Sequence, residues 1–135
     1  MIRFNNSKTS KNKKLLIVIS DLIRKIFGGD RVKRLSLVMI KISKEIYKKD
    51  KRKMNILDFG CGSMEISKKL EKLSYVKNIV GVDTFSGKFK TKKMQYIKYD
   101  DFFKKNKKKF DIIIAVDVLH HIGVDNSYKT LKKLS

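Results

Sequence analysis

The chain has 135 residues, of which 41% are hydrophobic, enough for one ordinary domain with a single core. Lys and Arg total 34 against 13 acids, a formal net charge of +21, but only five are Arg. We interpret the charge as a lysine-rich compositional bias that gives generic attraction to nucleic acid, because built phosphate sites favour Arg. The single cysteine, Cys61, excludes an internal disulfide framework and fits a reducing, cytoplasmic compartment.

The N-terminal part begins with a polar, basic segment, residues 1–12, which we expect to be a disordered tail. Apolar residues then recur at helical spacing from Leu15 to Ile26, and this spacing predicts a first helix that ends at Gly28-Gly29. The apolar run LLIVIS within it is too short to span a bilayer and has no cleavage site. The sequence therefore predicts no transmembrane segment and no cleaved signal.

A second helix is expected after Asp30, which can cap it, with an apolar stripe from Val32 to Ile46 and lysines on the other face. We therefore assign residues 13–50 to N-terminal helices that precede the main domain, residues 51–135. Both stripes suit packing against a core. A basic amphipathic helix on a membrane surface is the alternative.

From residue 54 onward, short apolar runs of β-forming residues alternate with polar, helix-forming stretches. The expected strands are MNILDF (54–59), NIVGVD (78–83), MQYIKY (94–99) and FDIIIAVDVL (110–119), and helices are expected over 65–73 and 126–135. Strands separated by helices imply parallel βαβ units and a Rossmann-like α/β sheet. In such sheets, ligands bind beyond the carboxyl ends of the strands.

Polar residues stand at the carboxyl end of each of these four runs. The four run ends are Asp58-Phe59-Gly60-Cys61-Gly62, Asp83, Asp100-Asp101-Phe102, and Asp117 with His120 and His121. The glycines permit a tight turn and a close approach of backbone N–H groups to a ligand, and Asp83 suits a ribose diol. One such acid alone would often be a helix cap, and a glycine turn alone would equally suit a nicotinamide dinucleotide. Four such polar run ends, at the same relative position in each strand–helix unit, predict one shared binding crevice.

This order of motifs resembles the class I S-adenosylmethionine-dependent methyltransferases over about residues 30 to 135. The matching motifs are ILDFGCG (56–62), GVD (81–83), YIKYDDF (96–102) and FDIIIAVDVLHHI (110–122). The resemblance implies strand order 3-2-1-4, S-adenosyl-L-methionine as the cofactor, no metal, and methyl transfer to an acceptor. A nicotinamide dinucleotide enzyme fits less well, because the acid-Gly-x-Gly turn and the His-His segment depart from its pattern.

The resemblance also implies roles for the residues of the first two motifs. Gly60, Cys61 and Gly62 would lie against the amino-acid part of the cofactor, and Asp58 would shape their loop. Asp83, with Thr84 beside it, would hold the ribose hydroxyls.

The third and fourth motifs would contact the rest of the cofactor. By the same resemblance, Asp100 would meet the adenine amino group, with Asp101 and Phe102 beside the ring. Val116 and Asp117 would line the floor near the sulfonium.

The implied reaction is an in-line displacement of the methyl group, for which the protein mainly aligns the acceptor and, where needed, removes its proton. Asp117, His120 and His121 are the candidate bases, although a helix-start or packing role also suits the histidines. The chain has no proline, which argues against the proline-containing motifs of enzymes that methylate base amino groups or cytosine carbon-5. We expect a small-molecule acceptor rather than RNA. The alternative is an inactive cofactor-binding remnant or a basic RNA-binding module with the same fold.

Two features depart from the family pattern. Met64 stands where a third small residue is usual, so its side chain would either crowd the cofactor or be absorbed by packing. The family sheet has seven strands, whereas this sequence reaches Ser135 just after the fourth, so we expect a truncated domain. The run FDIIIAVDVL would then be an exposed apolar edge through which the protein could self-associate.

Overall fold

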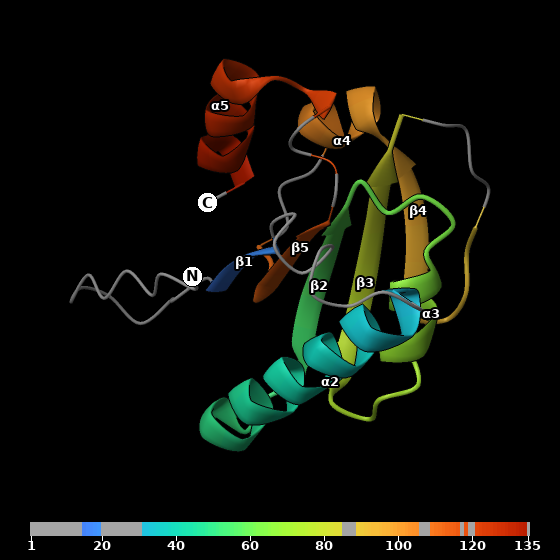
Figure 1. Ribbon diagram of the computed structural model, residues 1–135. Coiled ribbons are helices and arrows are strands. Elements are labelled where there is room, and N and C mark those ends of the chain that lie inside the picture. The colour runs from blue at the N-terminus through green and yellow to red at the C-terminus, as the bar shows by residue number, and fades with distance from the viewer. Residues whose placement is uncertain are drawn as a thin grey trace.

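The computed structural model describes residues 15–19, 31–84, 89–105, 109–116, 118 and 121–134. Five strands form one parallel sheet in the order β1-β5-β2-β3-β4 (Figure 1). The strands are β1 (Leu15–Ile19), β2 (Met54–Phe59), β3 (Val76–Asp83), β4 (Met94–Lys98) and β5 (Ile112–Val116). The four strands from β2 to β5 correspond to the four predicted runs, and their spatial order confirms the predicted order 3-2-1-4.

The segment Leu15–Ile19 is a strand, so the helix predicted from Leu15 is wrong over these residues; residues 20–26 lie outside the described part. β1 pairs in parallel with β5, with Leu15 opposite Ile112 and Ile19 opposite Val116. A short continuous apolar run fits a buried strand as well as a helix, and the free edge of β5 decides between them. The expectation that the fourth predicted strand would be an edge without a neighbour is therefore also wrong.

Helices cover both faces of this sheet. α2 (Arg31–Asp50) and α3 (Glu65–Leu70) lie over one face, whereas α4 (Tyr99–Lys105) and α5 (Val124–Leu134) pack on the other (Figure 1). The strands supply alternate residues to the two faces, as their period of two requires: in β2, Ile56 joins the first core cluster and Leu57 the second. The second predicted helix and the helices expected over 65–73 and 126–135 are present with shifted ends, and α4 is a helix that the sequence did not predict.

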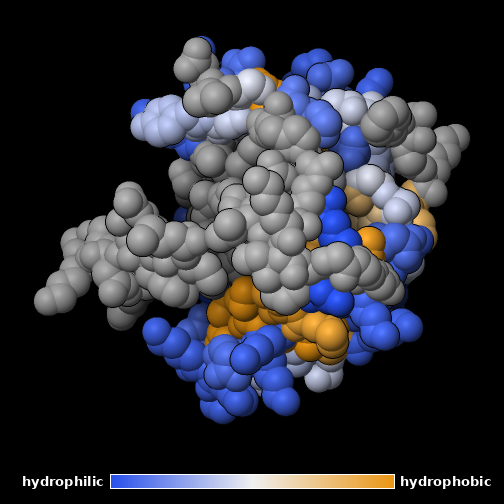
Figure 2. All heavy atoms as spheres, viewed as in Figure 1, coloured by the Kyte–Doolittle hydropathy of each residue, from blue (hydrophilic) through white to orange (hydrophobic). Residues whose placement is uncertain are grey.

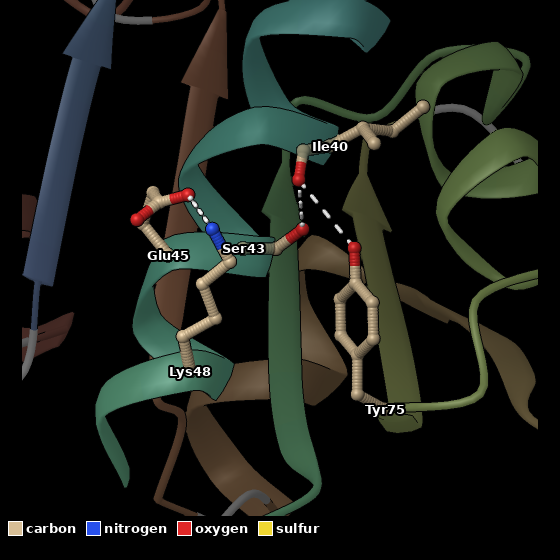
Figure 3. Close-up of polar contacts among 5 residues, drawn as sticks. All are labelled: Ile40, Ser43, Glu45, Lys48 and Tyr75. Carbon is tan, nitrogen blue, oxygen red and sulfur yellow. Dashed lines mark hydrogen bonds and ion pairs between the residues drawn. The ribbon is translucent and has the colours of Figure 1, made fainter. Parts of the chain in front are cut away.

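α2 is fixed to the sheet through its backbone as well as its apolar face. The Ser43 hydroxyl donates to the Ile40 carbonyl at 3.0 Å, and the Tyr75 hydroxyl lies 3.5 Å from the same oxygen (Figure 3). The Tyr75 ring also stacks on Tyr47, with centroids 5.0 Å apart. Because Tyr75 directly precedes β3, these contacts hold α2 against the amino end of that strand.

Asp111 fixes the amino ends of β2 and β5. Its carboxylate accepts hydrogen bonds from the Asn55 N–H at 2.8 Å and from the Arg52 guanidinium at 2.6 Å, and its own N–H donates to the Asn55 carbonyl at 2.8 Å. These contacts fix the register of two central strands at the end of the sheet opposite to the predicted crevice.

The surface of α2 combines charged and apolar residues. Val32, Leu37 and Val38 are exposed apolar side chains of this helix, and Figure 2 shows apolar atoms flanked by hydrophilic ones where α2 crosses the sheet. Among the described residues, no helix is both long and apolar enough to cross a membrane.

Candidate functional site

The turn Gly60–Gly62 connects β2 to α3 at the carboxyl end of the sheet. The N–H groups of Gly60 and Cys61 both donate to the Val82 carbonyl of β3, at 2.7 and 3.1 Å, so the turn folds over the neighbouring strand. Gly60 and Gly62 have positive φ angles of 75° and 50°, which glycine adopts without steric cost. The local chain direction is therefore set by the two glycines.

The two glycines have different surroundings. A Cβ on Gly60 would overlap Val118 Cβ and lie 2.6 Å from Val118 Cγ2, so Val118 packs directly on this turn. A Cβ on Gly62 would meet no atom within 4 Å. The turn is thus closed on the side of Val118 and open at Gly62, which leaves room for a ligand to approach the backbone there.

Asp83, at the carboxyl end of β3, is joined to this turn. Its carboxylate accepts a hydrogen bond from the Gly62 N–H at 2.8 Å and another from the Thr84 N–H at 2.7 Å, while the Thr84 hydroxyl lies 3.3 Å away. Its backbone carbonyl accepts the Tyr96 hydroxyl of β4 at 3.0 Å. The structure therefore brings Gly62, Asp83 and Thr84 together, although they come from two separate sequence motifs.

Asp58 lies in β2 just before the turn and is only 4% exposed. One of its carboxylate oxygens accepts the hydroxyl of Ser67, a fully buried residue of α3, at 2.6 Å. Burial raises the pKa of Asp58 to about 6; the Ser67 hydrogen bond opposes this rise, and the negative charge of Asp83 adds to it. Asp58 is thus held under the turn by α3 and does not face open solvent.

Cys61 is partly buried within the turn. Burial, together with the charges of Asp58 and Asp83, raises the pKa of its thiol to about 12. The thiol therefore stays protonated near neutral pH and is a poor nucleophile. In this position Cys61 is a packing residue of the turn.

Met64 does not crowd the open side of the turn. Its backbone is left-handed, with φ 59° and ψ 28°, and its side chain is 2% exposed within the first core cluster. A Cβ on Gly81 of β3 would lie 2.5 Å from Met64 Cε, so the thioether fills the space that Gly81 leaves empty. The large residue is absorbed by packing against a glycine of the second motif.

The third motif forms the start of α4. Asp100 and Asp101 lie in its first turn, where acids favour a helix N-terminus, and Asp100 is exposed. Phe102 is 3% exposed and packs in the second core cluster, with its ring 5.1 Å from that of Phe103 and 6.2 Å from that of Phe110. The structure places the Phe102 ring in the core on the other face of the sheet from Ser67, so it does not bring Phe102 together with Asp58.

The fourth motif is described only in part. Val116 is half-buried and packs against the first core cluster, whereas Asp117 and His120 lie outside the described residues. His121 is exposed, and its N–H donates to the Val118 carbonyl at 3.1 Å. Since Val118 also lies against Gly60, this hydrogen bond connects His121 to the glycine turn.

Two residues of this site were given no role from the sequence. Ser67 holds Asp58, and Tyr96 holds the backbone of Asp83. Ser67 could have been found from the sequence, because it lies on the buried face of a short amphipathic helix and a buried hydroxyl needs a hydrogen-bond partner. Tyr96 lies within the third motif, but a tyrosine in a strand is so common that only its contact reveals the role.

Comparison with known proteins agrees with this geometry. The family described as "Methyltransferase domain" matches residues 30–135, a segment that contains the glycine turn, Asp83 and β2 to β5. No curated protein and no solved structure matches the chain. The match covers more than half of the sequence, and the parallel sheet has the class I S-adenosylmethionine-dependent methyltransferase fold. The chain therefore belongs to the methyltransferase-domain family.

Proposed function

We propose that this protein is an S-adenosyl-L-methionine-dependent methyltransferase whose acceptor is a small molecule. The observation that carries the proposal is the 2.8 Å hydrogen bond from the Gly62 N–H to the Asp83 carboxylate. It joins the glycine turn of one strand to the acid of the next at the carboxyl edge of a parallel sheet, where such folds bind nucleotides. The family match supports the same activity.

The described residues fit the cofactor. Asp83 is held by the Gly62 and Thr84 N–H groups, and a carboxylate has further lone pairs with which to accept the two ribose hydroxyls. The open space at Gly62 lets the amino-acid part of the cofactor approach the turn. The exposed Asp100 at the start of α4 is proposed to meet the adenine amino group, with Asp101 beside the ring.

The bound cofactor would supply an activated methyl group on its sulfonium, so the work of the protein is alignment and the handling of one proton. Val116, at the end of β5, would line the floor of the site. We assign the proton-accepting role to the segment that contains Asp117, His120 and His121. Within it, His121 is exposed and lies in a turn that is fixed to Gly60 through Val118.

A small-molecule acceptor is favoured over RNA by the composition of the chain. The positive charge comes almost entirely from lysine. Lysine attracts nucleic acid non-specifically and lacks the planar guanidinium group with which arginine binds phosphate. The absence of proline removes the motifs by which base-methylating enzymes hold planar amino groups.

Calorimetric titration with S-adenosyl-L-methionine and S-adenosylhomocysteine tests the proposal. Asp83→Ala should weaken both ligands at least about tenfold, because it removes charged hydrogen bonds to the ribose. Glu45→Gln, which changes an exposed acid on the far helix α2, is the matched control and should leave both affinities unchanged. Folded protein that gives no heat with either ligand would refute the proposal.

Incubation with radiolabelled cofactor and fractionated cell extract then identifies the acceptor class. Label in the small-molecule fraction supports the proposal, and label in RNA would overturn the acceptor assignment. Cofactor binding without label in any fraction would indicate an inactive remnant. An affinity for RNA that falls steeply with salt concentration and does not depend on the RNA sequence would reflect the positive charge of the protein alone.

A further inference from the structure

The pair of Asp58 and Ser67 lies beneath the glycine turn and has no role in the function proposed above beyond shaping the loop. Asp58 is 4% exposed and Ser67 is fully buried, and their oxygen atoms are 2.6 Å apart. A buried carboxylate is costly unless hydrogen bonds satisfy it, and the Ser67 hydroxyl offsets part of this cost. The Ser67 hydroxyl thus satisfies one oxygen of the buried carboxylate.

Among the described residues, the charged group that acts on Asp58 is Asp83. On β3 the residue in register with Asp58 is Gly81, and on β5 it is Ile114, neither of which titrates. The charge that acts on Asp58 is that of Asp83, and Asp58 and Asp83 in turn act together on Cys61 in the turn. Two carboxylates thus lie close enough to the same turn to act on Cys61.

We propose that Ser67 is a positioning residue of the cofactor site: its hydroxyl holds Asp58 under the glycine turn and keeps it ionised, so that the two carboxylates together attract the positively charged cofactor. This inference rests on the proposed function. Ser67 acts through Asp58 and does not touch the ligand. It lies in α3, which begins at Glu65 shortly after the turn, so the helix that follows the glycines also holds the carboxylate beneath them.

If the ionised Asp58 attracts the cofactor, the affinity for the cofactor should depend on pH. The protonated Asp58 carboxyl carries no charge, so a cationic ligand binds better to the ionised form and releases the proton of Asp58 to solvent. Affinity for S-adenosyl-L-methionine should therefore rise with pH around the pKa of Asp58, which is about 6, and level off above it. Removing the Ser67 hydroxyl should move this rise to higher pH, because a hydrogen bond to the charged form favours it.

The test compares wild-type protein with Ser67→Ala between pH 5.5 and 8.5. Ser67→Ala should bind S-adenosyl-L-methionine about fivefold more weakly at pH 6 and within about twofold at pH 8.5, since the midpoint moves up by about one pH unit. The matched control is Ser43→Ala, which also removes a buried serine hydroxyl, on α2, and should change neither the affinity nor its midpoint. An equal loss of affinity at every pH would show a merely structural role and overturn the proposal.

A second measurement does not depend on the cofactor. Carbon-13 NMR titration of the Asp58 carboxyl in cofactor-free protein should give a midpoint near 6 in the wild type and a higher one in Ser67→Ala. An unchanged midpoint would refute the control of Asp58 by Ser67. If the wild type binds neither cofactor nor product, the proposed function fails, and this titration still decides whether Ser67 controls the charge of Asp58.

Discussion

The packing of Met64 on Gly81 gives a prediction that the structure makes quantitative. A methyl group added at Gly81 would lie 2.5 Å from Met64 Cε, 2.9 Å from Met64 Sδ and 2.9 Å from Cys61 Sγ. Gly81 lies within β3, so alanine meets no backbone obstacle there and the cost is one of space alone. Overpacking of a core typically costs about 1–3 kcal/mol, and we expect Gly81→Ala to fall in that range.

The partner variant Met64→Ala removes a side chain that is buried in the same cluster. A buried methionine truncated to alanine typically costs about 2–5 kcal/mol. In the double variant, the methyl group at Gly81 occupies part of the space that the thioether leaves. The double variant should therefore be more stable than the sum of the two single changes by at least about 1 kcal/mol.

Urea unfolding of the four proteins, followed by circular dichroism, measures this coupling. The control cycle replaces Met64→Ala by Met54→Ala, because Met54 is equally buried in the same cluster but is not among the atoms nearest to Gly81. That cycle should be additive. If the Gly81 and Met64 changes also add within about 0.5 kcal/mol, the explanation of Met64 given above is wrong.

Three further predictions follow from the site and the sheet. Because the pKa of Asp58 rises from 3.8 to about 6 on folding, the wild type should lose about 2 kcal/mol of stability relative to Asp58→Asn as pH increases from 4 to 7. A difference in unfolding free energy that stays constant with pH would contradict this. The Cys61 thiol, with a pKa of about 12, should react with a disulfide reagent at pH 8 about 100-fold more slowly in native than in urea-unfolded protein, and equal rates would show an accessible thiolate. Deleting residues 1–19 removes the partner strand of β5, so sedimentation should detect concentration-dependent association, whereas a monomer at all concentrations would show that β1 does not protect this edge.

The strands and their order could be predicted from the sequence because the signal is local. Each of the four apolar runs from residue 54 is short, rich in β-forming residues and followed by polar residues, and each is a strand. The segment at Leu15 gave the wrong result because its residues satisfy both a helical spacing and a buried strand. Its structure depends on β5, whose free edge lies about a hundred residues away in the chain.

The contacts of the candidate site follow from the sequence to different degrees. Gly62 and Asp83 each mark the end of a strand, and parallel strands bring their ends to one edge, so their meeting follows from the fold class. Phe102 lies in α4, which begins at Tyr99, and its ring packs in the second core cluster. The direction of the Phe102 side chain depends on where α4 starts. The sequence around Phe102 did not predict that start.

The sequence by itself determined the class of fold, the strand ends that meet at the candidate site and the glycines of the turn, since these depend on periodicity and on backbone freedom. Only the tertiary structure decided that Ser67 holds Asp58, that Met64 fills the space above Gly81 and that β1 covers β5. These contacts join residues of different elements. Their geometry is set by how the elements pack, and no local pattern of residues carries that information.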